Sequence, residues 1–145
     1  MLQHNVRILL FTGIILYASH ALAGGVAVID SNYLKKSSAA DKNIWERWIA
    51  EFKSAQTDAR SEVTKRYALE EEALFKDIDV KVNDYLLNTK RCDRILDLTK
   101  DPEAKKTFSP DASLTFELLD KINKTWFPVK LTNPIIPISD SSTLK

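Results

Sequence analysis

Carboxylate side chains gather in one stretch of the chain, where three consecutive glutamates at residues 70–72 are followed by Asp77 and Asp79. Paired carboxylates catalyse proton transfer when burial or neighbouring charges separate their pKa values. Consecutive glutamates on a helix point to different sides, however, and Lys65 and Arg66 lie close by in the sequence as counter-ions. The pattern therefore favours a solvated, ion-paired helix face over a pair of catalytic acids, and we expect the protein not to be an enzyme.

The chain beyond residue 23 is poor in histidine and glycine, on which many catalytic and cofactor sites depend. His4 and His20 are the only histidines, and both belong to an N-terminal segment that we expect to be removed. Beyond residue 23, Gly24 and Gly25 are the only glycines. These counts argue against a serine–histidine nucleophile and a glycine-rich phosphate loop, and leave a serine–lysine pair as the remaining alternative. We expect no catalytic residue, no cofactor and no metal site.

Large aromatic side chains are the best candidates for binding. Trp45, Trp48 and Phe52 recur at helical spacing and therefore share one stripe. Such a stripe either packs inside the fold or presents an apolar surface to a partner or client protein. Trp126 and Phe127 lie further along the chain and either contact a partner or fold back on the domain as a lid. These five residues are the candidate contact residues.

The first 23 residues have the features of a cleavable secretory signal. Arg7 gives a positive region, residues 8–18 an uncharged apolar run, and residues 21–23 (ALA) a small-x-small cleavage site before Gly24. The apolar run is shorter than the roughly 20 residues that span a bilayer, although an uncleaved N-terminal anchor is the alternative. We therefore predict that the mature chain begins near Gly24 and works outside the cytoplasm.

Charge and cysteine content narrow the choice of partners. Of the 21 basic residues only Arg7 lies in the predicted signal, which leaves 20 basic and 20 acidic residues in the mature chain. A neutral chain does not favour nucleic acid or an anionic membrane as its partner. Cys92 is the only cysteine, so no internal disulfide forms. It is either a small buried hydrophobic residue or a thiol that reacts or pairs between chains.

A long helical arm is predicted to carry the aromatic stripe. Residues 41–90 contain neither glycine nor proline and place apolar residues at helical spacing, with Asp41 at the N-cap. A straight helix of this length would measure roughly 75 Å. We favour a helical hairpin with a polar tip, bent at about residues 58–66, and a single long helix is the alternative. In the hairpin the aromatic stripe would lie at the base of the arm and face an apolar group formed by Ile78, Val82 and Tyr85.

The remaining segments predict a small head and a tail. Residues 25–29 predict a strand, with Asp30 or Ser31 capping a short helical turn after it, and residues 91–97 predict a second strand. Residues 105–108 are expected to form a short edge strand. The predicted fold is therefore α+β and mostly α, with a small β-containing head, a long helical arm and a C-terminal helix. A head this small rarely stabilises itself, so we expect a homo-oligomer.

The last part of the chain divides into a helix and a tail. Ser109 or Asp111 is predicted to cap a helix that ends near Lys124 and carries one apolar face. Residues 125–145 contain three prolines and have neither helical nor strand periodicity. We expect them to form an extended or disordered tail.

Taken in this order, the elements resemble the Skp/OmpH family of periplasmic chaperones. The first strand, residues 26–30 (VAVID), looks like the family's first strand, and residues 92–97 (CDRILD) are similar to its return strand. Residues 111–113 (DAS) stand where the family has a D-I-T helix start, and residues 118–123 (LLDKIN) follow as its terminal helix does. The resemblance covers residues 24–124, which we identify as an OmpH-like domain.

The resemblance implies a periplasmic holdase chaperone, in which oligomerised heads hold helical arms that shield unfolded or outer-membrane client proteins. Here the arm is about half the family's usual length, the chain is neutral where the family's chaperones are basic, and the tail has no counterpart. Small periplasmic proteins of F-type conjugative transfer systems look similar in plan. The alternative function is therefore a structural or assembly component of a secretion or conjugative transfer apparatus.

Overall fold

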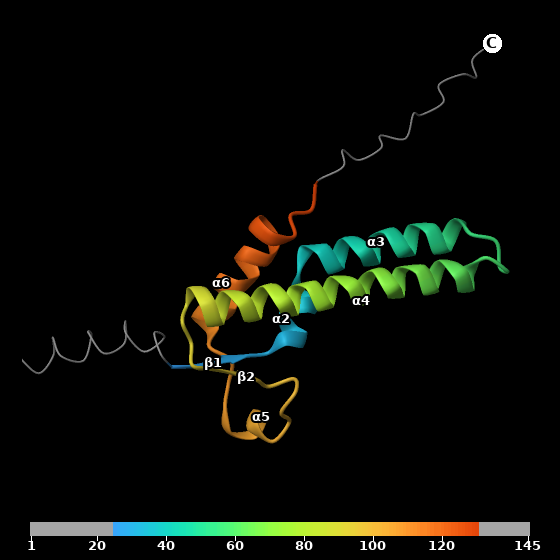
Figure 1. Ribbon diagram of the computed structural model, residues 1–145. Coiled ribbons are helices and arrows are strands. Elements are labelled where there is room, and N and C mark those ends of the chain that lie inside the picture. Colours follow the sequence, from blue (N-terminus) through green and yellow to red (C-terminus); the bar gives the residue numbers. More distant parts are fainter. Residues whose placement is uncertain (1–24, 131–145) are drawn as a thin grey trace, which may run out of the picture.

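Residues 25–130 are the part of the chain that the computed structural model describes, and Figure 1 shows their arrangement. The elements, in chain order, are β1 (Val26–Ile29), α2 (Ser31–Ser37), α3 (Ala39–Ser54), α4 (Arg60–Asp84), the π-helical turn η1 (Tyr85–Thr89), β2 (Arg94–Asp97), α5 (Ala104–Thr107), α6 (Ala112–Lys121) and the π-helical turn η2 (Ile122–Trp126). The fold is α+β and mostly α, as predicted. The proposed signal, residues 1–23, and the tail beyond Lys130 lie outside the described residues.

Strands β1 and β2 lie side by side and run parallel, with Val26 opposite Arg94 and Ile29 opposite Asp97. Parallel strands need a long crossover connection, which α2, α3 and α4 provide here. The Leu98 amide extends the ladder by donating to the Ile29 carbonyl at 2.8 Å. Both strands that the sequence predicted are therefore confirmed, and the crossover between them is the helical arm.

The segment that follows β2 is helical, so the predicted edge strand at residues 105–108 is wrong. Asp101 accepts a hydrogen bond from the Ala104 amide at 3.0 Å and thereby starts α5. The Phe108 amide donates to the Ala104 carbonyl at 2.8 Å, which closes the turn. The local acceptor at Asp101 satisfies the backbone here without a neighbouring strand.

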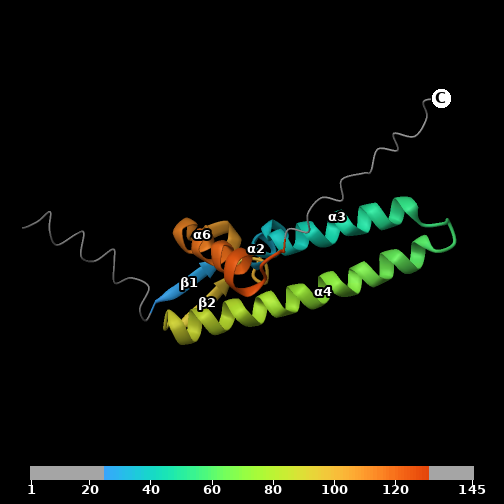
Figure 2. The same cartoon turned by 90° about the horizontal axis from the view of Figure 1, so that it is seen from above.

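Helices α3 and α4 form an antiparallel hairpin that projects from the head (Figures 1 and 2). The hairpin prediction is confirmed against the single long helix, but the bend comes earlier than predicted, at residues 55–59. Ala55 leaves the helical region with ψ 144°, and the Ala59 amide donates to the Gln56 carbonyl at 3.0 Å. Thr57 and Asp58, which favour turns, complete the connection without glycine or proline.

The start of the arm also differs from the prediction. Ser38 caps α3 by accepting the Asp41 amide at 3.1 Å, so Asp41 lies in the first turn and is not the N-cap. The break between α2 and α3 is correspondingly short, because α2 ends at Ser37. The Asn123 side chain accepts a hydrogen bond from the Ala39 amide at 2.8 Å, and this bond connects the start of the arm to η2.

The two helices of the hairpin have unequal lengths, and this corrects the predicted contacts at the base of the arm. Because α3 is 16 residues long and α4 is 25, the aromatic stripe meets only the first half of α4. Trp48 and Phe52 pack around a small cluster formed by Ile44, Val63 and Tyr67. The stripe therefore lies on the outer part of the arm and does not face Ile78, Val82 and Tyr85.

The second half of α4 belongs to the head instead. Ile78, Val82 and Leu86 pack with Ala27 and Ile29 of the sheet. The C-terminal helix α6 adds its predicted apolar face to the same core through Leu114 and Leu118, and Ile122 at the start of η2 continues this face. Asp111 caps α6 by accepting the Leu114 amide at 3.0 Å, which settles the predicted choice between Ser109 and Asp111.

Candidate functional site

An open groove runs along one edge of the hairpin, between α3 and the first half of α4. Its volume is about 150 Å³, and we call it the aromatic groove. Its lining residues are Ile44, Trp45, Trp48, Thr64, Tyr67, Ala68 and Glu71. Two of the predicted contact residues, Trp45 and Trp48, form its α3 wall, and the α4 wall was not recognised in the sequence.

The α3 wall belongs to a row of aromatic rings in contact, whose third member, Phe52, does not line the groove. Trp45 and Trp48 meet edge to face with their ring centroids 5.0 Å apart, and Phe52 follows at 5.2 Å from Trp48. The Trp48 indole N–H donates to Thr64 Oγ1 at 3.3 Å across the groove. Trp45 is 51% exposed, although tryptophan is usually largely buried. The row thus combines a half-buried anchor, Trp48, with an open ring, Trp45.

Carboxyl groups lie at the head end of the groove. Glu71 forms an ion pair with Lys36 of α2, and the hydrogen bond from Lys36 holds the pKa of Glu71 below its usual value. Asp41 is 4% exposed, and its Oδ1 atom has no hydrogen-bond partner among the described residues. Burial and the neighbouring Glu71 carboxyl together raise the pKa of Asp41. The groove is therefore apolar along its walls and acidic at one end.

The other edge of the hairpin is closed by charged side chains. Arg47 of α3 pairs with Glu70 of α4, and Glu51 pairs with Arg66. The Tyr67 hydroxyl donates to Glu51 at 2.7 Å. The consecutive residues Glu70 and Glu71 thus point to opposite edges, as the sequence indicated, and their partners are basic residues. These contacts support the predicted ion-paired face.

Trp126 and Phe127 lie apart from the aromatic groove. Trp126 packs edge to face on Tyr85 with the ring centroids 5.7 Å apart, and both Trp126 and Phe127 pack against the head core. Phe127 also lines a hollow of about 430 Å³ beside Arg47 and Glu70, on the charged edge of the hairpin. These two residues therefore cover the head as a lid, which is one of the two predicted alternatives, and the structure does not join them to Trp45 and Trp48.

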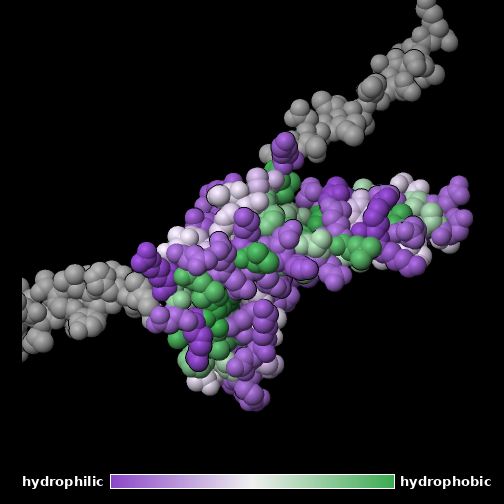
Figure 3. All heavy atoms as spheres, viewed as in Figure 1, coloured by the Kyte–Doolittle hydropathy of each residue, from purple (hydrophilic) through white to green (hydrophobic). Residues whose placement is uncertain are grey.

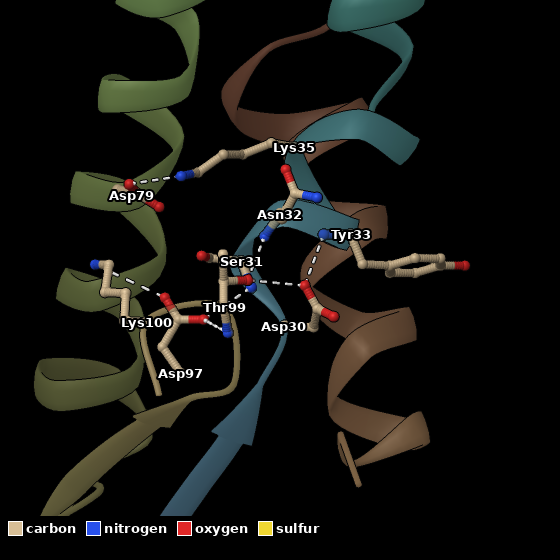
Figure 4. A network of polar contacts seen from close by, with 9 residues as sticks. All are labelled: Asp30, Ser31, Asn32, Tyr33, Lys35, Asp79, Asp97, Thr99 and Lys100. Atoms are coloured by element: carbon tan, nitrogen blue, oxygen red, sulfur yellow. Dashed lines mark hydrogen bonds and ion pairs between the residues drawn. The ribbon is translucent and has the colours of Figure 1, made fainter. Parts of the chain in front are cut away.

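A polar network joins the carboxyl ends of both strands, and it was not predicted from the sequence (Figure 4). Asp97 Oδ1 accepts the amides of Ser31 and Thr99, each at 3.1 Å. Asp30 Oδ1 accepts the Tyr33 amide and the Thr99 hydroxyl, each at 2.9 Å. Burial acts to raise the pKa of Asp97, but the hydrogen bonds from Ser31 and Thr99 outweigh it and the pKa lies below its usual value. The network fastens α2 to β2 and leaves these carboxylates fully engaged.

Other potential sites are structural or absent within the described part of the chain. Cys92 is buried in the head core, and burial raises the pKa of its thiol, which agrees with the prediction of a small hydrophobic residue. Residues 25–130 contain no group of histidine, cysteine and acidic side chains placed to hold a metal ion. None of the helices in this range has the length and hydropathy needed to cross a bilayer.

Comparisons of the chain with protein-family models, with curated proteins and with solved structures each returned no match. Function must therefore be argued from the chain's own residues. Among them, the aromatic groove is the surface whose composition is best suited to binding another molecule.

Proposed function

We propose that the protein is a non-enzymatic, periplasmic holdase-type chaperone that binds apolar segments of unfolded exported proteins, including outer-membrane proteins. The observation that carries the proposal is the open aromatic groove, in which Trp45 is half exposed beside Trp48. Exposed aromatic side chains in a groove offer apolar contact to any extended chain, with little demand on its sequence. No cofactor or nucleotide takes part in such passive binding.

Oligomerisation through the heads is part of the proposal, because several arms are needed to surround a client. In the view of Figure 3 the largest hydrophobic area lies on the head, over β1 and β2, whereas the arm is mainly hydrophilic. Val26 on β1 is 45% exposed, and Phe108, which follows α5 in the head, is 49% exposed. Sedimentation equilibrium at micromolar concentration should therefore give at least a dimer, and we expect a trimer. A folded monomer would contradict this part of the proposal.

The main test of the function is suppression of aggregation. The purified mature chain should keep a diluted, denatured outer-membrane protein in solution at near-stoichiometric ratio and without ATP. A chain that ends at Lys130 should protect equally well, because the cut leaves Trp126 and Phe127 packed on the head. Failure to protect any of several unrelated clients would contradict the holdase function.

The second candidate function is a structural or assembly role in a secretion or conjugative transfer apparatus. The small volume of the groove, about 150 Å³, favours it, because such a groove suits one defined segment of a fixed partner better than many different chains. The two functions predict opposite results. The assembly role predicts no protection of unfolded clients and capture of a single secretion-system protein, which is lost when the tail is removed.

A further inference from the structure

We infer that the aromatic groove recognises a cationic side chain, arginine or lysine, carried by an extended segment of the bound protein. The inference rests on the proposed function, since it names the chemistry of the segment that the groove accepts. The walls of the groove are aromatic and apolar, and its head end is acidic. This combination is not required for binding apolar chains alone.

The aromatic wall is the first part of the argument. Tryptophan is the side chain whose ring face attracts a cation most strongly, and here Trp45 and Trp48 stand next to each other. Trp45 is 51% exposed, so its ring is accessible to a group that enters from solvent. Arginine in addition stacks its planar guanidinium on aromatic rings, while its aliphatic stem covers apolar surface.

The acidic end of the groove is the second part. Glu71 lines the groove, and Asp41 lies buried beside the Glu71 carboxyl group. Lys36 pairs with Glu71, but its side chain is 47% exposed and also lies 4.8 Å from the centroid of the Phe75 ring. Two carboxyl groups thus lie beside one ammonium, and Asp41 Oδ1 has no hydrogen-bond partner within residues 25–130. A cation that enters the groove can therefore compete with the Lys36 ammonium for the Glu71 carboxylate, whose side chain is 29% exposed.

The volume of the groove limits the size of the group that it can bind. Sites for small-molecule ligands usually measure about 300–1,000 Å³, whereas the aromatic groove measures about 150 Å³. It therefore accommodates the end of one long side chain. The open edge of the hairpin leaves room for the polypeptide that carries this side chain to lie along α3 and α4.

Binding of a matched pair of peptides tests the inference. The probes are acetyl-Ser-Val-Arg-Val-Ser-amide and the same peptide with citrulline, a neutral isostere, in place of arginine. Binding is followed through the indole N–H signals of Trp45 and Trp48 in NMR spectra of the full mature chain. We expect the arginine peptide to bind at least about fivefold more tightly than the citrulline peptide. Equal affinities, or no binding of either peptide up to about 10 mM, would overturn the inference.

Substitutions locate the contact within the groove. Glu71→Gln and Trp45→Ala should each remove most of the preference for arginine, whereas Glu72→Gln, at an exposed neighbouring carboxylate that does not line the groove, should leave it unchanged. Lys36→Gln should strengthen binding of the arginine peptide, because it removes the competing ammonium. A preference that survives both Glu71→Gln and Trp45→Ala would place the cation elsewhere and overturn the inference.

The result is separable from that of the aggregation test. Protection of unfolded clients without any preference between the two peptides would leave the holdase function in place and remove the inference. A preference for arginine without protection of clients would support the inference and contradict the holdase function, and would point to a fixed partner with a basic residue in its bound segment.

Discussion

Helix α4 takes part in two hydrophobic clusters of different character, one in the head and one in the arm. In the head, Ile78 and Val82 of α4, continued by Leu86 of η1, pack beneath the sheet and against α6, and each is at most 2% exposed. In the arm, Val63 and Tyr67 are 8% and 9% exposed and pack mainly against α3. The C-terminal end of α4 is thus enclosed by the head, whereas its N-terminal end is covered on one side by α3.

We propose that the head provides most of the stability and that the arm provides the binding surface. The head core joins elements that are far apart in the sequence and is sealed by α6 and Trp126. The two helices of the arm are joined by a small apolar cluster and by surface ion pairs, and each ion pair contributes little to stability. A chain stabilised in this way keeps its fold through the head, and its arm is left with an aromatic surface open to a partner. Substitutions in the two regions should therefore have different consequences.

The largest effect is expected from truncation in the head. Leu118 is fully buried on α6, so Leu118→Ala should lower the free energy of unfolding by about 3–4 kcal/mol through lost burial and the cavity left behind. Chemical denaturation followed by circular dichroism measures it. A loss below about 1 kcal/mol would mean that the head core is not the main source of stability.

A smaller effect is expected from the half-buried anchor of the arm. Trp48 packs against the Ile44 cluster and donates to Thr64, but it retains partial exposure. Trp48→Ala should therefore cost about 2 kcal/mol, less than a fully buried tryptophan would. Thermal unfolding gives the value. A loss as large as that of Leu118→Ala would show that the arm is as important to stability as the head.

Acid should weaken the head through Asp97. Because its pKa lies below the usual value in the folded chain, the carboxylate stabilises the fold above about pH 4 and this contribution is lost as the pH falls through the folded-state pKa. Asp97→Asn should cost about 1 kcal/mol at pH 7, allowing for partial solvent screening. The cost should shrink towards zero in strong acid. Asp58→Asn, in the exposed turn of the arm, is the matched control and should have no effect at either pH.

Local sequence signals predicted the elements but not how they meet. Short apolar runs indicated β1 and β2, one apolar face at helical spacing indicated α6, and the length of residues 41–90 indicated the hairpin. The contacts of the aromatic stripe were misplaced because the bend lies nearer to Phe52 than expected, which makes α3 shorter than α4. No glycine or proline marks this bend, so its position depends on packing between the helices.

Only the α3 wall of the candidate site could be predicted from the sequence, for a similar reason. Trp45 and Trp48 stand out by their type, whereas the opposite wall consists of Thr64, Tyr67 and Ala68, which are ordinary residues for a helix. The network of Asp30 and Asp97 depends on two strands becoming parallel neighbours, 68 positions apart in their register. In sequence, the only trace of it is an aspartate that follows the apolar residues of each strand.

The central claim is that the open aromatic surface of the arm binds proteins and does not hold the fold together. The most direct measurement compares Trp45→Ala with Phe116→Ala, since Phe116 is 74% exposed on α6, away from the groove. Both variants should keep the melting temperature of the unmodified chain. Trp45→Ala alone should lose suppression of client aggregation, by at least about fivefold in the concentration required. Equal protection by the two variants, or a large fall in the melting temperature of Trp45→Ala, would contradict the claim.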